Sequence, residues 1–306
     1  MLFQRRGLTA LSAAGPRFFL AVMLLSGAFA SGGVCAAEQS ERLTYNIMVG
    51  GLHVGDSMIA LEQSPSGYRT EMRMTAKGMA KWVQNFRSDL RGEGSFAESA
   101  IKPVPATFTR QWSNGEIAAE MTMTFDPATR EAVTAERYFN PETAAPIARE
   151  DLPWFDKDDR RQRTVPADMR TGALDPMAAF VAARSQLLAQ GIDGKTARTF
   201  RVATYDGRRR YDVVGRAEPA RMVSFGGVER SVIPVIAKLE PVFGFGRKSQ
   251  ERMKDSEGKF LFSNDQRFIP LQLVISNEIV SGVMNLTADC SVDPAPCDTF
   301  GQEKAE

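Results

Sequence analysis

One histidine and a few patterned groups of side chains decide which chemistry this 306-residue chain can perform. His53 is the single histidine, so a Ser-His-Asp or Cys-His apparatus would have to use it. It stands beside Gly50-Gly51, where we expect a solvated turn residue. Zinc sites need several His or Cys ligands, which the chain lacks. We therefore expect no enzyme, no metal and no cofactor. A hydrolase that uses paired carboxylates on an envelope polysaccharide stays open as an alternative, since the chain has 37 acidic residues.

Methionines at alternate positions of two predicted strands form a candidate apolar lining. Side chains two residues apart lie on one face of a strand, and methionine is flexible and polarizable enough to contact varied apolar shapes. Such faces could hold a lipid-like ligand, or they could fill a core around a helix, and the helix's need for apolar surface favours the core. The candidate ligand-binding residues are Met72, Met74, Met121, Met123, Phe125 and Phe180.

Three consecutive arginines, Arg208, Arg209 and Arg210, follow the dipeptide Asp206-Gly207. Asp-Gly is a strong signal for a tight hairpin turn, so the three side chains are predicted at a hairpin tip. There they could contact anionic lipid headgroups or phosphate. A solvated hairpin end is the simpler interpretation, and we favour it.

Two cysteines near the C-terminus, Cys290 and Cys297, are predicted to form a disulfide. Pro294 and Pro296 bend the short segment between them. Once the third cysteine, Cys35, leaves with the predicted export signal, the exported chain has an even number of cysteines, which indicates pairing. A metal site would lack further ligands. In the chain-entropy model a loop this short stabilises by only about 2–3 kcal/mol, so the bond would hold a C-terminal loop in place.

The first 37 residues have the pattern of a cleavable export signal. Arginines precede an apolar run at 18–30, and small residues allow cleavage near Ala36 or Ala37. The run is too short to span a bilayer, which needs about 20 apolar residues. Cys35 would leave with the signal, because Val34 before it does not suit lipid attachment. We expect a periplasmic protein.

The remaining chain is nearly neutral and has no further membrane-spanning pattern. The signal holds three of the 38 basic residues and none of the acidic ones, which leaves a net charge of −2. Nucleic acid is therefore not an expected partner. No later stretch approaches 18 consecutive apolar residues. We predict one β-rich domain at 38–306, with the disulfide-bearing loop at about 289–306.

Alternation of apolar and polar residues predicts ten to fourteen short strands. Asn114-Gly115 and Asp206-Gly207 mark tight hairpins, and one long strand is expected from Val223 to Leu239. The segment 175–190 has the signals of a helix, with Asp175 as its N-cap and one apolar stripe. The fold class is therefore mainly β: an antiparallel curved sheet, open or spiral and barrel-like, with one amphipathic helix packed inside.

The order of these segments resembles the DUF3108 family of exported bacterial proteins. The likeness rests on LTYNIMVGGLHVGDSMIALE (43–62), YRTEMRMTAKGMAKWVQNFRSDLRGEG (68–94), LDPMAAFVAAR (174–184), VATYDGRRRYDV (202–213) and FIPLQLVISNEIVSGVMNLTA (268–288). The resemblance implies a β-rich exported fold and no established activity. It supplies no catalytic residues. The stretch 140–171 and the cysteine-bearing tail depart from the family's pattern.

Three functions remain open at this point. The first is a non-enzymatic periplasmic protein of the cell envelope that binds a lipid-like or other apolar ligand in its concave sheet. The second is a scaffold with a filled core that binds another envelope protein through a sheet edge. The third is the carboxylate-based hydrolase. An empty apolar cavity would favour the first function, and a filled core with an exposed edge would favour the second.

Overall fold

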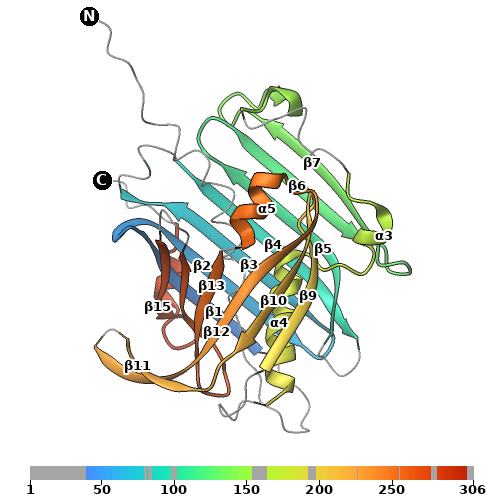
Figure 1. Cartoon of the computed structure of the whole chain (residues 1–306). Coiled ribbons are helices and arrows are strands. Elements are labelled where there is room, and N and C mark those ends of the chain that lie inside the picture. The colour runs from blue at the N-terminus through green and yellow to red at the C-terminus, as the bar shows by residue number, and fades with distance from the viewer. Residues whose placement is uncertain are drawn as a thin grey trace, which may run out of the picture.

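The chain folds into one large antiparallel sheet that curves around a helix (Figure 1). The structure, a computed structural model, describes residues 39–78, 81, 85–97, 102–153, 164–191, 198–225, 227–254, 256–276 and 281–301. The predicted signal at 1–37 lies outside the described residues. The strands are β1 (Gln39–Val49), β2 (Leu52–Ser64), β3 (Gly67–Ala76), β4 (Arg87–Ala97), β5 (Lys102–Ser113), β6 (Ala118–Phe125), β7 (Ala132–Phe139), β8 (Pro146–Ile147), β9 (Arg198–Tyr205), β10 (Arg210–Ala217), β11 (Arg221–Phe225), β12 (Val228–Phe243), β13 (Glu257–Ser263), β14 (Pro270–Ser276) and β15 (Ser281–Asp289). The helices are α3 (Ala167–Arg170), α4 (Pro176–Ala189), α5 (Arg247–Lys254), α6 (Ala295–Asp298) and a 3-10 turn, η1 (Arg149–Asp151).

The sheet consists of two meanders that join where the chain begins and ends. The strand order is β8-β7-β6-β5-β4-β3-β2-β1-β15-β14-β13-β12-β10-β9, with β11 attached to β12 alone. The joining pair runs from Leu43 opposite Asp289 to Val49 opposite Gly282. The first and last strands therefore lie side by side in the middle of the sheet, and the predicted mainly β, barrel-like fold is confirmed.

Alternation gives the strands of the barrel wall an inner apolar face and an outer, more polar face. Along β6, Met121, Met123 and Phe125 are buried while Thr122 and Thr124 are exposed. The predicted hairpin at Asn114-Gly115 joins β5 to β6, and the one at Asp206-Gly207 joins β9 to β10. Both glycines have the positive φ that such turns favour.

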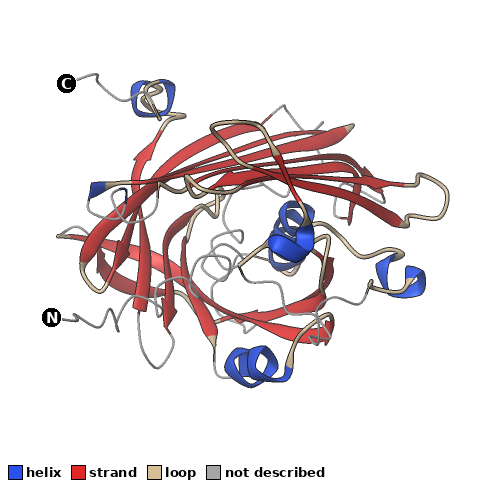
Figure 2. Cartoon of the chain, turned by 90° about the horizontal axis from the view of Figure 1, so that it is seen from above, coloured by secondary structure: helices blue, strands red, loops and turns tan. Residues whose placement is uncertain are grey.

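Helix α4 lies inside the curved sheet, between its two walls (Figure 2). Asp175 caps it as predicted, because its Oδ1 accepts hydrogen bonds from the backbone N–H groups of Met177 and Ala178. Eleven of the 14 helix residues are buried, so apolar contact extends far beyond the single predicted stripe. A Cβ on Gly92 of β4 would lie 3.1 Å from the Cβ of Met177, so this glycine lets the helix start lie close to the sheet.

A short segment spans the opening between the two edges of the sheet. Among the described residues no backbone ladder joins β7 to β9. Instead the N–H of Gly172 donates to the carbonyl of Arg130, before β7, and the N–H of Leu174 donates to the carbonyl of Ala203 on β9. Leu174 also forms an isolated parallel bridge with Thr204. The sheet is therefore open in its strand order but nearly closed in space.

The prediction of one continuous strand from Val223 to Leu239 is wrong. The structure divides it into β11 and β12, with Gly227 at φ +79° in the connection. Glycine at 227 takes the positive φ of a tight turn without strain, which outweighs the apolar alternation on either side.

In the described part of the chain, no helix is long and apolar enough to cross a membrane.

Candidate functional site

The predicted apolar lining is part of a packed core. All six side chains are at most 9% exposed and belong to one buried cluster that includes α4 and the inner faces of the strands. The cluster contains the candidate residues Met72, Met74, Met121, Met123, Phe125 and Phe180. The structure therefore brings the predicted residues together, around the helix.

A small cavity remains beside Phe180, between α4 and the strands that face it. Its volume is about 20 Å³, and its lining includes Arg184, Leu187 and Phe200. A cavity of this size holds about one water molecule. The packed side chains of this region leave no preformed space for an acyl chain.

Two buried charges connect the helix to β1. Arg184 Nη2 lies 4.0 Å from Glu41 Oε1, with both side chains nearly inaccessible, and it donates to the carbonyl of Arg267 at 2.7 Å. Burial raises the pKa of Glu41 to about 7, although the positive charge of Arg184 lowers it. Burial also lowers the pKa of Arg184 to about 9. Removing one partner would leave a buried charge without its counter-charge, so the pair fixes the position of the helix.

Asp175, the N-cap of α4, is a second buried carboxyl. Its Oδ1 accepts hydrogen bonds of 2.8 and 2.9 Å from two backbone N–H groups, while its Oδ2 has no partner among the described residues. Burial raises the pKa of Asp175 to about 7 against the opposing effect of those hydrogen bonds. The sequence predicts this residue as a helix cap, but nothing in the sequence indicates that strands cover it.

The three predicted tip arginines are bound by their own chain. Arg208 donates to Glu136 of β7 at 2.9 and 2.8 Å, and Glu136 also pairs with Arg110 at 3.3 Å. The second arginine, Arg209, lies over the ring of Phe245, and the third, Arg210, pairs with Asp212 at 2.6 Å. The β9–β10 hairpin therefore closes the barrel against β7. The three arginines stand out in the sequence, but no sequence pattern indicates that Glu136 is their partner.

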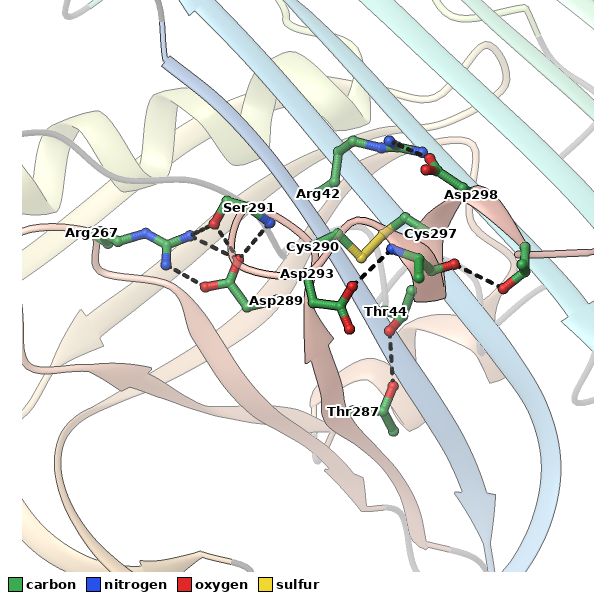
Figure 3. Close-up of a disulfide and its surroundings, with 12 residues drawn as sticks. Arg42, Thr44, Arg267, Thr287, Asp289, Cys290, Ser291, Asp293, Cys297 and Asp298 are labelled. Carbon is green, nitrogen blue, oxygen red and sulfur yellow. Dashed lines mark hydrogen bonds and ion pairs between the residues drawn. A yellow bond between two sulfur atoms is a disulfide. The ribbon is translucent and has the colours of Figure 1, made fainter.

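The predicted disulfide between Cys290 and Cys297 is present and fastens the C-terminal segment to the outer face of the sheet (Figure 3). The N–H of Cys290 donates to the carbonyl of Arg42 at 2.8 Å, and Arg42 pairs with Asp298 of α6 at 2.9 Å. Both cysteines pack with Met58 in a small buried cluster that is separate from the main core. We call residues 289–301 the C-terminal clasp.

Strand β11 and the start of β12 form an arm that extends beyond the barrel (Figure 1). Among the described strands β11 pairs only with β12, so its other edge has no partner strand. Met222 is 60% exposed and Val228 is 56% exposed. Phe225 stands opposite Val228 on the same face, and Arg230 lies over its ring. Adjacent Gly226-Gly227 is the sequence signal that could have located this arm.

Comparisons with known proteins give a family and a distant structural likeness. The sequence model of DUF3108, described as a protein of unknown function, matches residues 44–287. A comparison with curated proteins finds no match. Among solved structures, the chain is similar to a β-barrel-like protein of the DUF1849 domain of unknown function from Brucella abortus. The identity is 12%, the match covers 81% of this chain and 95% of that one, and the TM-score is 0.43.

Proposed function

We propose that this chain, which belongs to the DUF3108 family of proteins of unknown function, is an exported, non-enzymatic protein of the cell envelope that binds a partner polypeptide. Two observations support export to the periplasm. Residues 1–37 have the charge and apolar pattern of a cleavable signal. The disulfide of the C-terminal clasp suits an oxidising compartment.

The free edge of the β11–β12 arm is the observation that carries the proposal. An unpaired strand edge presents a row of backbone donors and acceptors to any extended chain that approaches it. Proteins usually protect such edges, because they invite pairing. Here the edge strand is well separated from the barrel wall and carries exposed apolar side chains, which suits addition of a strand from another polypeptide.

The side chains of the arm indicate the chemistry of the partner segment. Val223, Phe225 and Val228 share one face with Arg221 and Arg230, as the β11–β12 register requires. A segment that pairs with β11 would place every second side chain against this face. We expect an extended segment whose side chains on that face include both apolar and acidic residues.

The filled interior supports partner binding over the lipid-carrier function. An apolar ligand inside the sheet would have to displace packed side chains, since the cavity beside Phe180 measures only about 20 Å³. Displacing core side chains sacrifices their packing and costs several kcal/mol. The carboxylate-based hydrolase remains an untested prediction.

Photocrosslinking in living cells tests this function. A photoreactive amino acid at Val228 should give one discrete protein adduct, and peptide mapping should place the crosslink in an extended, acidic segment of the partner. The matched control is Val133 on β7, which is equally exposed at 56% but lies away from the arm. Crosslinking there should not give that adduct.

A charge reversal on the arm separates specific pairing from chance contact. Arg230→Glu should abolish the adduct at Val228, because the partner's acidic side chains would then face a like charge. An adduct that forms equally at Val133, or that persists in Arg230→Glu, would contradict the proposal.

A further inference from the structure

A polar groove lies on the outer face of the sheet, beside the C-terminal clasp. Its volume is about 240 Å³. Thr44, Asp56 and Thr75 from β1, β2 and β3 line it together with Thr299 and Phe300 of the clasp. Thr44 faces outward with Met58, its register partner, while the neighbouring Tyr45 faces the core. The groove therefore opens on the outer face, with the core residue Tyr45 also in its lining, and it lies away from the arm.

A row of hydrogen-bonding side chains runs across the strands into this groove. Gln272, Asn285, Asn46, Asp56 and Thr75 stand in register on five adjacent strands. The amide of Gln272 donates to Asn285 at 2.8 Å, and the amide of Asn285 donates to Asn46 at 3.2 Å. This chain of hydrogen bonds ends at Asn46, whose register partner Asp56 lines the groove and accepts from His53 Nε2 at 2.8 Å.

The clasp makes the groove's second wall and holds it in position. Phe300 packs on Met58 and the disulfide. On the opposite side, Thr44 and Thr287 share a hydrogen bond of 3.0 Å between their hydroxyls (Figure 3). A covalent link and two paired strands therefore fix this wall, so the groove is preformed, which reduces the ordering cost of binding.

The lining selects for an uncharged, hydroxyl-rich ligand. One carboxylate, on Asp56, and one ammonium, on Lys77, balance in charge, so neither an anion nor a cation is favoured. Several threonine hydroxyls can each donate and accept. The buried Oγ1 of Thr75 has no hydrogen-bond partner among the described residues, and such atoms are normally paired. Phe300 offers an apolar surface at the edge.

We propose that this groove binds one residue of a neutral saccharide. Sugar rings present alternating hydroxyl donors and acceptors to amides, carboxylates and threonines, and they present C–H faces to an aromatic ring. The volume lies just below the roughly 300 Å³ at which pockets for drug-sized ligands begin, which fits a single ring of a longer glycan. Asp56 Oδ1 accepts a hydrogen bond from His53 Nε2 at 2.8 Å, so Asp56 Oδ2 is the acceptor for a sugar hydroxyl, and Thr75 supplies a further hydrogen bond.

NMR titration of the full oxidised chain with diacetylchitobiose and with maltotriose tests the proposal. At least one of the two should shift the backbone amides of Thr44, Thr75 and Thr287 in a saturable manner. No shift with either saccharide, or shifts confined to other strands, would overturn it. Saturable shifts of the same amides with inorganic phosphate alone would also overturn it, because the site would then be an anion site.

Matched variants assign the binding to named groups. Asp56→Ala should weaken binding more than tenfold, and Thr75→Val about fivefold, as expected for losing a charged and a neutral hydrogen bond. Thr122→Val is the control, because Thr122 is an exposed threonine on the outer face of β6, away from the groove. Unchanged affinity in Asp56→Ala, with a native spectrum, would contradict the assignment. An equal loss in Thr122→Val would contradict it as well.

Discussion

Replacing Asp175 by asparagine should change how the stability of the protein depends on pH. Burial raises the pKa of this carboxyl from 3.8 to about 7 in the folded chain. Between these two values the folded chain holds a proton that the unfolded chain has released. The free energy of unfolding must therefore fall as the pH rises through this window, and it levels off above about pH 7.

The size of the effect follows from the two pKa values. A difference of about 3 between them corresponds to about 4 kcal/mol of lost stability above pH 7. Asparagine caps a helix about as well as aspartate does and carries no charge. Asp175→Asn should therefore match the natural protein near pH 4 and exceed it by up to about 4 kcal/mol at pH 8.

Urea unfolding of both proteins across this pH range measures the difference directly. Glu41 also has a raised pKa, but it titrates in both proteins, so its effect cancels when they are compared. Asp168→Asn serves as the control, because Asp168 is an exposed acid in the first turn of α3. If the free energies of unfolding of Asp175→Asn and the natural protein differ by the same amount from pH 4 to pH 8, then ionising Asp175 does not destabilise the folded chain, and the reasoning is refuted.

Three further sets of substitutions test the packing, the clasp and the closure of the barrel. Phe180→Ala enlarges a cavity in the core and should lower the free energy of unfolding by about 3–5 kcal/mol in urea; a loss below about 1 kcal/mol would mean the core is loose. Converting Cys290 and Cys297 to alanine should cost about 2–3 kcal/mol without changing the far-ultraviolet circular dichroism spectrum. Glu136→Gln removes a carboxylate shared by the half-buried Arg110 and Arg208 and should cost about 2 kcal/mol. The control is Glu120→Gln, whose partner Arg137 is exposed, and it should cost under about 1 kcal/mol. Equal losses in these last two variants would contradict a closing role for Glu136.

Local pattern was enough to predict most of the fold. The Asn114-Gly115 and Asp206-Gly207 turns, the cap at Asp175 and the Cys290–Cys297 bond each depend on residues close together in sequence. Such features follow from backbone preferences that one residue type satisfies. They are therefore readable before any tertiary contact is known.

Other features depend on contacts that sequence does not display. Helix α5 lacks the apolar periodicity that marks a buried helix, because its sequence, RKSQERMK, is almost wholly polar. The pairing of Arg208 with Glu136 joins residues 72 positions apart. The closing segment around Leu174 is visible only once β9 and β7 are brought near each other.

The candidate site shows the same division. The alternating methionines are predicted to share faces, and they do, but periodicity alone cannot tell a filled core from a ligand cavity. That distinction depends on how closely α4 approaches the sheet, which small residues such as Gly92 allow. The polar groove was missed because its row of side chains comes from five strands, one residue each.

Native mass spectrometry of the protein purified gently from its source, followed by organic extraction, tests the central claim that the interior is filled and that binding occurs on the outside. We predict the mass of the polypeptide alone, two hydrogens below the fully reduced value because of the Cys290–Cys297 bond, with no extractable lipid and no uptake of added fatty acid or phospholipid. A stoichiometric lipid adduct would contradict the account and would place the function inside the barrel.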